Sequence, residues 1–181
     1  MSSATSVVWT VVRREYAQRV RSRWFLFATL GVPLLMVVAT AIPLWFAGRE
    51  ESVARTLVEA ARALEPSPRL VVVGGAGGLE AAPGLRVIDT PSFPEFLRPI
   101  AQAHIDAFED VYLPSDVDWT FFAPAGTIQP GQRTGRYRTS RDQLVVDGGG
   151  KSSISAEDYA VALLDEVEKP QFRKSRMTAG Y

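Results

Sequence analysis

The 181-residue sequence has no cysteine and only one histidine, His104. Without cysteine there is no disulfide, no thiolate nucleophile and no thiolate metal ligand, and one histidine cannot build a poly-histidine metal cluster. Net charge is also lacking, because 20 basic residues balance 20 acidic residues. A chain without a basic excess gives no support to nucleic-acid binding. We therefore predict neither a metal site nor a nucleic-acid partner.

Charge is missing altogether from residues 24–47, which read WFLFATLGVPLLMVVATAIPLWFA. About 20 helical residues cross the hydrocarbon core of a bilayer, and membrane helices tolerate the proline and glycine residues found here. Trp24 and Trp45 stand near the two ends, where an aromatic belt places them. We predict a transmembrane helix over 24–47, in preference to a buried core helix or a cleaved signal peptide.

Residues 1–23 are predicted to form a basic amphipathic helix at the membrane interface, with lipid as its partner. Trp9, Val12, Tyr16 and Val20 share one helical face. Five arginines lie in the flank before the apolar stretch, at positions 13, 14, 19, 21 and 23, and three lie in the flank directly after it, at positions 49, 55 and 62. The arginine bias predicts a single-pass membrane protein with a cytoplasmic N-terminus.

Residues 7–47 resemble the start of the permease subunit of ABC-type exporters of the sodium and drug-efflux kind. The resemblance consists of an elbow of the form W-x-x-x-RRE-Y-x-x-R-V-R-S-x-x-F followed by Gly-x-Pro-Leu-Leu-Met. The matching residues are Trp9, Arg13, Arg14, Glu15, Tyr16, Arg19, Val20, Arg21, Ser22, Phe25, Gly31, Pro33, Leu34, Leu35 and Met36. Further membrane helices of such a permease are missing from this sequence, so the chain alone forms no transport pathway.

The rest of the chain is predicted to be α/β, with a partial Rossmann-like parallel sheet. We divide it into a linker and amphipathic helix (48–68), an incomplete NAD(P)-binding-like domain (69–170) and a basic, extended tail (171–181). The expected helices cover 52–64, 95–110 and 156–168, the last capped by Ser155. The expected strands cover 70–73 and 118–124, with two short strands at 137 and 144–147.

Four glycines, Gly74, Gly75, Gly77 and Gly78, follow the predicted strand 70–73. A dinucleotide-binding fingerprint needs a strand, a glycine turn and then a helix whose N-terminus faces the pyrophosphate. Here the turn leads into Leu79-EAAPG, which does not open a helix. A sharp turn with close backbone approach is therefore favoured over direct pyrophosphate binding, which stays as the alternative.

Residues 52–181 resemble the C-terminal part of NAD(P)H-binding atypical short-chain dehydrogenases, the NADH-flavin-reductase-like group. The resemblance is carried by ARTLVEAARAL (54–64), RLVVVGGAGGLEAAPG (69–84), DTPSFP (89–94), AQAHIDAFE (101–109), DWTFFAP (118–124), GxRTGRYR (131–138), DQLVVD (142–147) and KSSISAEDYAVALLDEVEKP (151–170).

This resemblance implies a cytoplasmic oxidoreductase with NADP or NAD as cofactor and a flavin- or quinone-like acceptor. It implies that the nicotinamide side of the cleft is lined by Gly74, Gly75, Ala76, Gly77, Phe122, Ala123 and Pro124. It also implies that residues 153–168 form a helix closing the substrate end. No catalytic residue is assigned.

The first half of that family holds the unit that binds the pyrophosphate, and residues 1–51 stand in its place. The chain is therefore interpreted as a fusion or truncation with impaired cofactor binding, and its status as an enzyme stays open. A half sheet also leaves a strand edge for self-association. The alternative function is a non-enzymatic exporter fragment carrying a passenger α/β domain.

Other candidates are weighed against structural roles. Tyr159 and Lys169 do not have the Tyr-x-x-x-Lys spacing of dehydrogenases, so Tyr159 is interpreted as helix core. His104 lies at core spacing on a predicted helix and is interpreted as structural. A group of arginines in a loop could meet an anionic ligand, although solvation is the default interpretation: Arg133, Arg136, Arg138 and Arg141.

Overall fold

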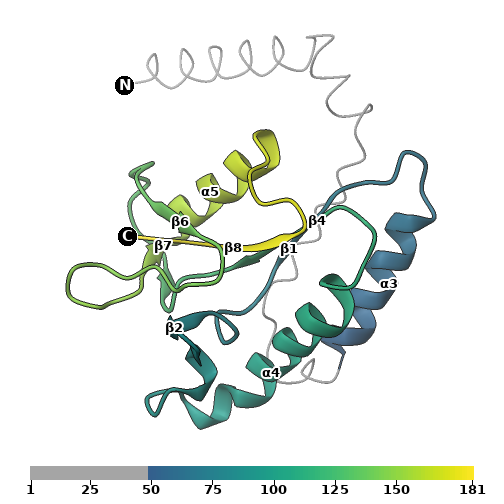
Figure 1. Cartoon of the computed structure of the whole chain (residues 1–181). Coiled ribbons are helices and arrows are strands. Elements are labelled where there is room, and N and C mark those ends of the chain that lie inside the picture. The colour runs from purple at the N-terminus through teal and green to yellow at the C-terminus, as the bar shows by residue number, and fades with distance from the viewer. Residues whose placement is uncertain (1–48) are drawn as a thin grey trace, which may run out of the picture. The chain divides into compact units, whose positions relative to one another are not determined.

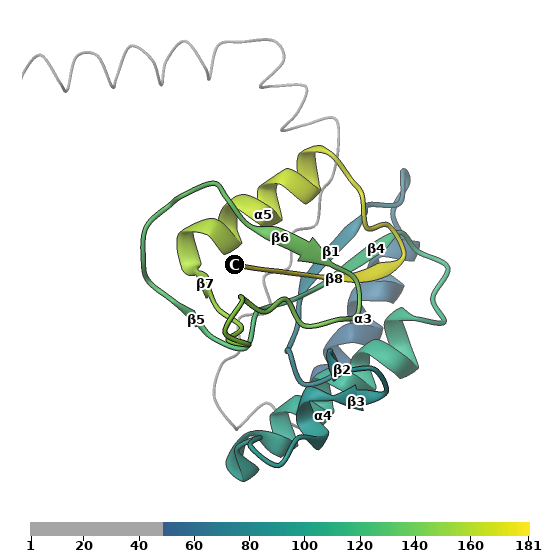
Figure 2. The same cartoon turned by 60° about the vertical axis from the view of Figure 1, so that its left-hand side comes forward.

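The apolar runs LVVV and WTFFA form neighbouring parallel strands, β1 (Leu70–Val73) and β4 (Trp119–Ala123), in the computed structural model, which describes residues 49–181. β8 (Ser175–Gly180) lies parallel on the far side of β4, and β6 (Arg138–Ser140) completes the sheet as an antiparallel strand. The strand order is β1-β4-β8-β6 (Figures 1 and 2). This confirms the α/β prediction with a sheet that is mainly parallel.

Three helices cover the two faces of this sheet. α3 (Glu50–Arg62) and α4 (Arg98–Ala107) lie on one face, and α5 (Ala156–Glu168) lies on the other (Figure 1). α4 continues into a π-helical turn, Phe108–Tyr112. The helices expected at 52–64, 95–110 and 156–168 are thus confirmed, with small shifts at their ends.

Alternation along β4 explains how one strand serves both faces. Trp119 and Phe121 pack with α3 and α4 in one core cluster, whereas Phe122 packs with α5 in the second cluster. Successive side chains of a strand point to opposite faces, so a strand covered on both sides is apolar at every position. All five residues of β4 are buried, and so are three of the four in β1.

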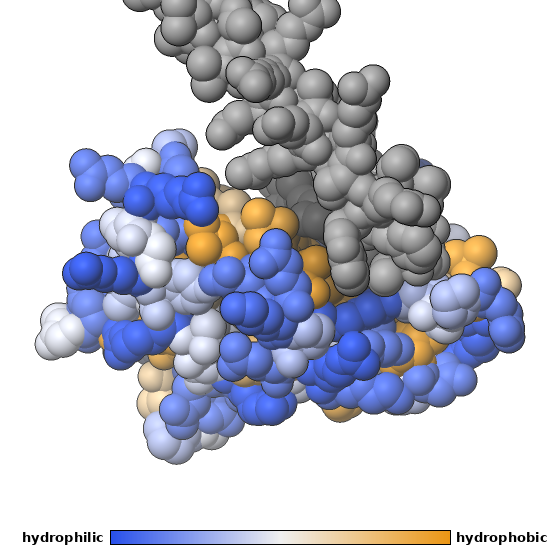
Figure 3. Space-filling view, turned by 90° about the horizontal axis from the view of Figure 1, so that it is seen from above, coloured by the Kyte–Doolittle hydropathy of each residue, from blue (hydrophilic) through white to orange (hydrophobic). Residues whose placement is uncertain are grey.

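Short elements join these layers. A hairpin and a two-stranded parallel ladder lie between the main strands, together with two 3-10 turns: β2 (Glu80–Ala82), β3 (Leu85–Arg86), β5 (Ile128–Gln129), β7 (Ile154–Ser155), Val87–Asp89 and Glu95–Leu97. Seen from above, the visible face of residues 49–181 is largely hydrophilic, with apolar residues scattered among charged ones (Figure 3).

Two predicted segments differ from the structure. Residues 171–181 are not a tail, because β8 pairs with both β4 and β6 and buries Met177, Thr178 and Ala179. Residues 175–180 contain no run of β-branched residues, so strand propensity does not predict β8. Hydrogen bonding to β4 and β6 stabilises it instead. Residues 144–147 form no strand; the Leu144 N–H only donates to the Glu80 carbonyl (2.8 Å).

No helix within residues 49–181 is long and apolar enough to cross a membrane. The interfacial helix predicted at 1–23, the transmembrane helix predicted at 24–47 and the permease resemblance of 7–47 lie outside the described residues. They remain predictions from the sequence.

β1 lies at an edge of the sheet, since within residues 49–181 it pairs with β4 alone. The Leu70 N–H donates to the carbonyl of Asp118, the residue before β4 (2.9 Å), and the Gly74 N–H donates to the Phe122 carbonyl in β4 (3.0 Å). Alternation directs the groups of Val71 and Val73 to the other side. Within residues 49–181 the second side of β1 has no strand partner, and the half sheet and self-association through its edge stay predictions.

A buried ion pair joins β1, β4 and α5. Arg69 and Glu166, whose side chains are 7% and 3% exposed, form a salt bridge, and Arg69 also donates to the Glu166 carbonyl (2.9 Å). Glu166 further accepts the backbone N–H groups of Gln171 (2.8 Å) and Phe172 (3.1 Å). The Thr120 hydroxyl donates to the Phe172 carbonyl (2.7 Å). This network fixes the chain between α5 and β8 against the sheet.

A second network fixes the start of α5. Asp158 is fully buried and accepts from the N–H and hydroxyl of Thr134, the N–H of Gly135 and the hydroxyl of Tyr181, all at 2.6–2.8 Å. Its own N–H donates to the Ser155 hydroxyl (3.0 Å), which confirms the predicted cap. The hydrogen bond from the Thr134 side chain is the largest of the effects that lower the pKa of Asp158 to about 2.

Removing one partner of the buried ion pair is expected to destabilise the fold strongly. Arg69→Met or Glu166→Gln leaves the other group buried without its partner, which costs about 3 kcal/mol or more. Urea unfolding of each variant, and of the double variant, measures the loss. The control is Arg62→Met, because its pair with Asp116 has side chains 54% and 71% exposed and contributes little. A loss under about 1 kcal/mol in both single variants would contradict this role.

Acid is expected to weaken the Asp158 network within a defined pH range. Because its pKa is lowered from 3.8 to about 2, the contribution of Asp158 to stability is complete above about pH 4 and is lost as pH falls towards 2. Asp158→Asn removes this part of the pH dependence of the unfolding midpoint measured from pH 2 to 7. Asp110→Asn, at an exposed position, serves as control. An unchanged pH profile in Asp158→Asn would refute the assignment.

Candidate functional site

The three parallel strands β1, β4 and β8 end at one edge of the sheet, at Val73, Ala123 and Gly180. In open α/β sheets, ligands bind outside the carboxyl ends of the strands. The loops that follow β1 and β4 are adjacent there, because the Gly74 N–H donates to the Phe122 carbonyl. This carboxyl edge is the candidate functional site.

The glycine turn after β1 packs against side chains of this same chain. A Cβ on Gly74 would stand 1.9 Å from the Phe121 ring, and a Cβ on Gly77 would stand 2.9 Å from the Ala101 side chain. No residue of the turn has a positive φ. Glycine is therefore required here because there is no space for a side chain, and the interpretation as a close backbone approach is confirmed.

The chain leaves this turn in a hairpin and not in a helix. The N–H groups of Leu79 and Ile88 donate to the carbonyls of Ala76 and Gly77, at 3.0 and 2.9 Å. These bonds fold β2 and β3 back beside the turn. The turn therefore has no helix N-terminus to bind a pyrophosphate, in agreement with the favoured interpretation of the sequence.

His104, on α4, packs against the glycine turn after β1 from the side of the core. A Cβ on Gly75 would lie 3.0 Å from the imidazole Cδ2, and the His104 residue is 8% exposed. Burial lowers the pKa of His104, and the negative charge of Glu50 opposes that effect. The imidazole is thus neutral near pH 7 and lies directly behind the candidate site, as the structural interpretation expects.

The predicted cofactor residues divide into two groups. Gly74, Gly75, Ala76 and Pro124 are partly exposed at the carboxyl edge. Three others are buried: Gly77, Phe122 and Ala123. Phe122 and Ala123 belong to β4, whose residues are covered on both faces, so their side chains do not reach a ligand. The exposed and buried members are direct neighbours in sequence, Ala76 beside Gly77 and Ala123 beside Pro124, so the resemblance alone did not separate them.

Tyr159 confirms its predicted role in the core. Its ring stacks on Phe122 with centroids 4.2 Å apart, and its hydroxyl donates to the Phe122 carbonyl (2.9 Å). Burial raises the pKa of Tyr159 well above its usual range. The phenol therefore stays protonated and holds α5 against the end of β4.

The four loop arginines do not converge on one ligand. Arg138 donates to the carbonyls of Val146 and Tyr181, and Arg141 lies over the Phe172 ring, 5.4 Å from its centroid. Only Arg136 and Arg138 line one depression, which also includes Tyr181. The anion site suggested by the sequence is therefore reduced to this pair.

A hydrogen-bonded network around Asp158, close to the carboxyl edge, is not predicted by the sequence. Asp158, Thr134 and Tyr181 bring together the start of α5, the 131–136 loop and the last residue after β8. The sequence contained only the local signal, a serine cap with Asp158 three residues on. Partners 23 and 24 residues away are decided by the fold, so no pattern in the chain predicts them.

A family of NAD(P)H-binding proteins matches residues 32–170 of this chain. The match starts within the apolar stretch 24–47, earlier than the resemblance recognised from residue 52. The YwnB protein of Bacillus subtilis (strain 168) is 41% identical over 130 residues. These residues are 67% of this chain and 61% of YwnB, so the chain spans less than two thirds of that relative.

Solved structures show the same architecture. A Burkholderia pseudomallei protein described as exported has 43% identity and a TM-score of 0.74, over 86% of this chain and 75% of that one. A Streptococcus pneumoniae protein that carries the name of an NADH-flavin reductase has 31% identity and a TM-score of 0.67, over 80% and 70%. With the family match spanning more than half of its length, this chain belongs to the NAD(P)H-binding family.

Proposed function

We propose that the chain is a membrane-tethered NAD(P)H-dependent reductase-like protein that has kept the nicotinamide and acceptor side of its site. Hydride would pass from C4 of the reduced nicotinamide to a flavin- or quinone-like acceptor, with the cofactor left oxidised. The observation that carries this proposal is the partly exposed turn Gly74–Ala76 beside Pro124 at the carboxyl edge, in a chain of the NAD(P)H-binding family.

The tether is argued from the sequence alone. Residues 24–47 carry no charge and are long enough to span a bilayer. Among the residues that directly flank the stretch, five arginines lie on the N-terminal side (positions 13–23) and three on the C-terminal side (positions 49–62). That bias favours an outward C-terminal part, although a domain that folds before translocation can override it. A working reductase requires the cytosolic side, because reduced nicotinamide cofactors are cytosolic.

Cofactor affinity is proposed to be low for a physical reason. A pyrophosphate is normally bound by the N–H groups at a helix N-terminus after a glycine turn. In residues 49–181 the glycine turn after β1 leads into a hairpin, and its glycines accommodate Phe121, His104 and Ala101. The nicotinamide end of the cofactor can bind at this edge, whereas the glycine turn there leads into no helix N-terminus whose N–H groups would bind the diphosphate.

The second proposed function is non-enzymatic: an exporter-permease fragment that carries an α/β passenger domain. The packing of the glycine turn favours it, since the close approach to Phe121 is a structural use of glycine. Self-association through the open edge of β1 belongs to the same proposal.

Cofactor titration separates the two proposals. Purified full-length chain is titrated with NADPH and, separately, with reduced nicotinamide mononucleotide, and binding is followed by tryptophan and nicotinamide fluorescence. If only the nicotinamide side is recognised, the two ligands bind with weak affinities within about threefold of each other. Much tighter binding of NADPH would reveal a functional pyrophosphate site, and no binding of either would support the non-enzymatic function.

A charge variant locates that binding. Ala76→Glu adds a carboxylate at a partly exposed turn residue and is expected to weaken binding of both phosphate-bearing ligands, by about fivefold or more. The matched control is Ala60→Glu at an exposed position near the end of α3, which leads to the amino end of β1, so that it adds the same charge away from the carboxyl edge. Equal effects of the two substitutions would show that the ligands bind elsewhere.

Membrane topology tests the proposal in the cell. A reporter fused after Tyr181, whose activity depends on the side of the membrane, is expected to report the cytosolic side if the chain acts as a reductase. The same fusion without residues 24–47 gives the cytosolic reference signal. An outward signal would exclude the reductase in the cell.

A further inference from the structure

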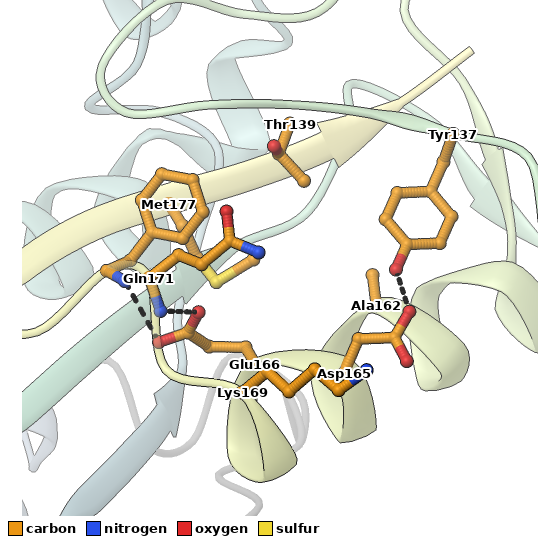
Figure 4. A pocket seen from close by; sticks show the side chains of 9 residues that line it. Tyr137, Thr139, Ala162, Asp165, Glu166, Lys169, Gln171 and Met177 are labelled. Carbon is orange, nitrogen blue, oxygen red and sulfur yellow. Dashed lines mark hydrogen bonds between the residues drawn. The ribbon is translucent and has the colours of Figure 1, made fainter.

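A cavity of about 320 Å³ lies between α5 and the sheet. Its wall includes Tyr137 and Thr139, the second half of α5 and the start of the return to β8 (Figure 4). Gln171 and Phe172 precede β8, so this end of the cavity lies towards the amino ends of the strands. The cavity wall includes neither the turn Gly74–Ala76 nor Pro124, so a nicotinamide bound at those residues would not fill the cavity.

One end of the cavity is acidic. The Tyr137 hydroxyl donates to the Asp165 carboxylate. Desolvation is the main effect that raises the pKa of Tyr137 to about 12, and the bond to Asp165 adds to it. The phenol thus stays protonated near neutral pH, and it orients a carboxylate whose other oxygen makes no hydrogen bond within residues 49–181.

A positive group stands one helical turn further on. Lys169 directly follows α5 and its N–H donates to the Asp165 carbonyl (2.8 Å); both residues line the cavity (Figure 4). The Lys169 ammonium forms no ion pair or hydrogen bond with any described residue. Asp165 and Lys169 therefore both line the cavity without forming a salt bridge with each other, since no N–O distance between them is 4.0 Å or less.

The remaining wall is neutral and partly apolar. Met177 and Ala162, 1% and 2% exposed, form a floor with the Phe172 ring. The side-chain amides and hydroxyls of Gln171 and Thr139 have no partner among the described residues and can donate or accept. Glu166 also lines the cavity, but its carboxylate is already paired with Arg69 and two backbone N–H groups.

We propose that this cavity binds a free α-amino acid with an apolar side chain. The ligand's ammonium pairs with Asp165, and its carboxylate pairs with Lys169 and the Gln171 amide. Its side chain rests on Met177 and Phe172. A zwitterion fits better than a simple anion, which would leave Asp165 unpaired, or a simple cation, which would leave Lys169 unpaired. The volume lies at the lower end of the range for ligand pockets, which suits a molecule of this size.

Calorimetric titration of the full-length chain with L-leucine, without nicotinamide cofactor, tests the proposal independently of the reductase function. Leucinamide lacks the carboxylate, 4-methylpentanoate lacks the ammonium and glycine lacks the side chain. Each is expected to bind at least about tenfold more weakly than leucine, because each loses one of the three contacts. Absence of leucine binding, or equal binding of all four compounds, would overturn the proposal.

Variants assign the two charges. Asp165→Asn and Lys169→Met are each expected to weaken leucine binding at least about tenfold, with the loss for Asp165→Asn absent for 4-methylpentanoate. Glu168→Gln is the matched control, because it removes a charge from an exposed neighbour outside the cavity wall. Thermal unfolding of each variant shows that the fold is kept. Leucine binding that is unchanged in both variants, or reduced equally by Glu168→Gln, would refute the site.

Discussion

The buried ion pair between Arg69 and Glu166 joins the parts of the structure that sequence order keeps far apart. Arg69 precedes β1, Glu166 lies near the end of α5, and the same carboxylate accepts the N–H groups of Gln171 and Phe172. Burying two charges is costly unless each finds partners, so the pair constrains the geometry around it. That constraint brings the chain back from α5 in the position from which β8 can enter the sheet.

Insertion of β8 has consequences at both ends of the strands. At one end, Met177 and the return segment close the cavity against α5. At the other, Tyr181 reaches Asp158 and Ser155 and fixes the loop over residues 131–136. The two candidate binding regions of the described chain thus both depend on a single strand, β8.

The glycines of the turn after β1 are required by packing within the chain. The Gly74 backbone lies against the Phe121 ring and the Gly75 backbone lies against His104, so the turn is closely packed on its inner side. A preformed edge of this kind can support the flat end of a cofactor. Within residues 49–181 the chain that follows the glycine turn forms a hairpin, so this turn is not followed by a helix N-terminus of the kind that binds a diphosphate.

The sequence by itself determined the strong local elements: strands β1 and β4 from their apolar runs, α5 with its Ser155 cap, and the structural roles of Tyr159 and His104. Local periodicity and capping chemistry encode these features within a few residues. Tertiary structure alone decided the strand at 175–180, the burial of Phe122 and Ala123 within the expected cofactor set, and the networks around Glu166 and Asp158. Each of these joins residues more than 20 positions apart or depends on cover from both faces, and such pairing arises only when the layers pack.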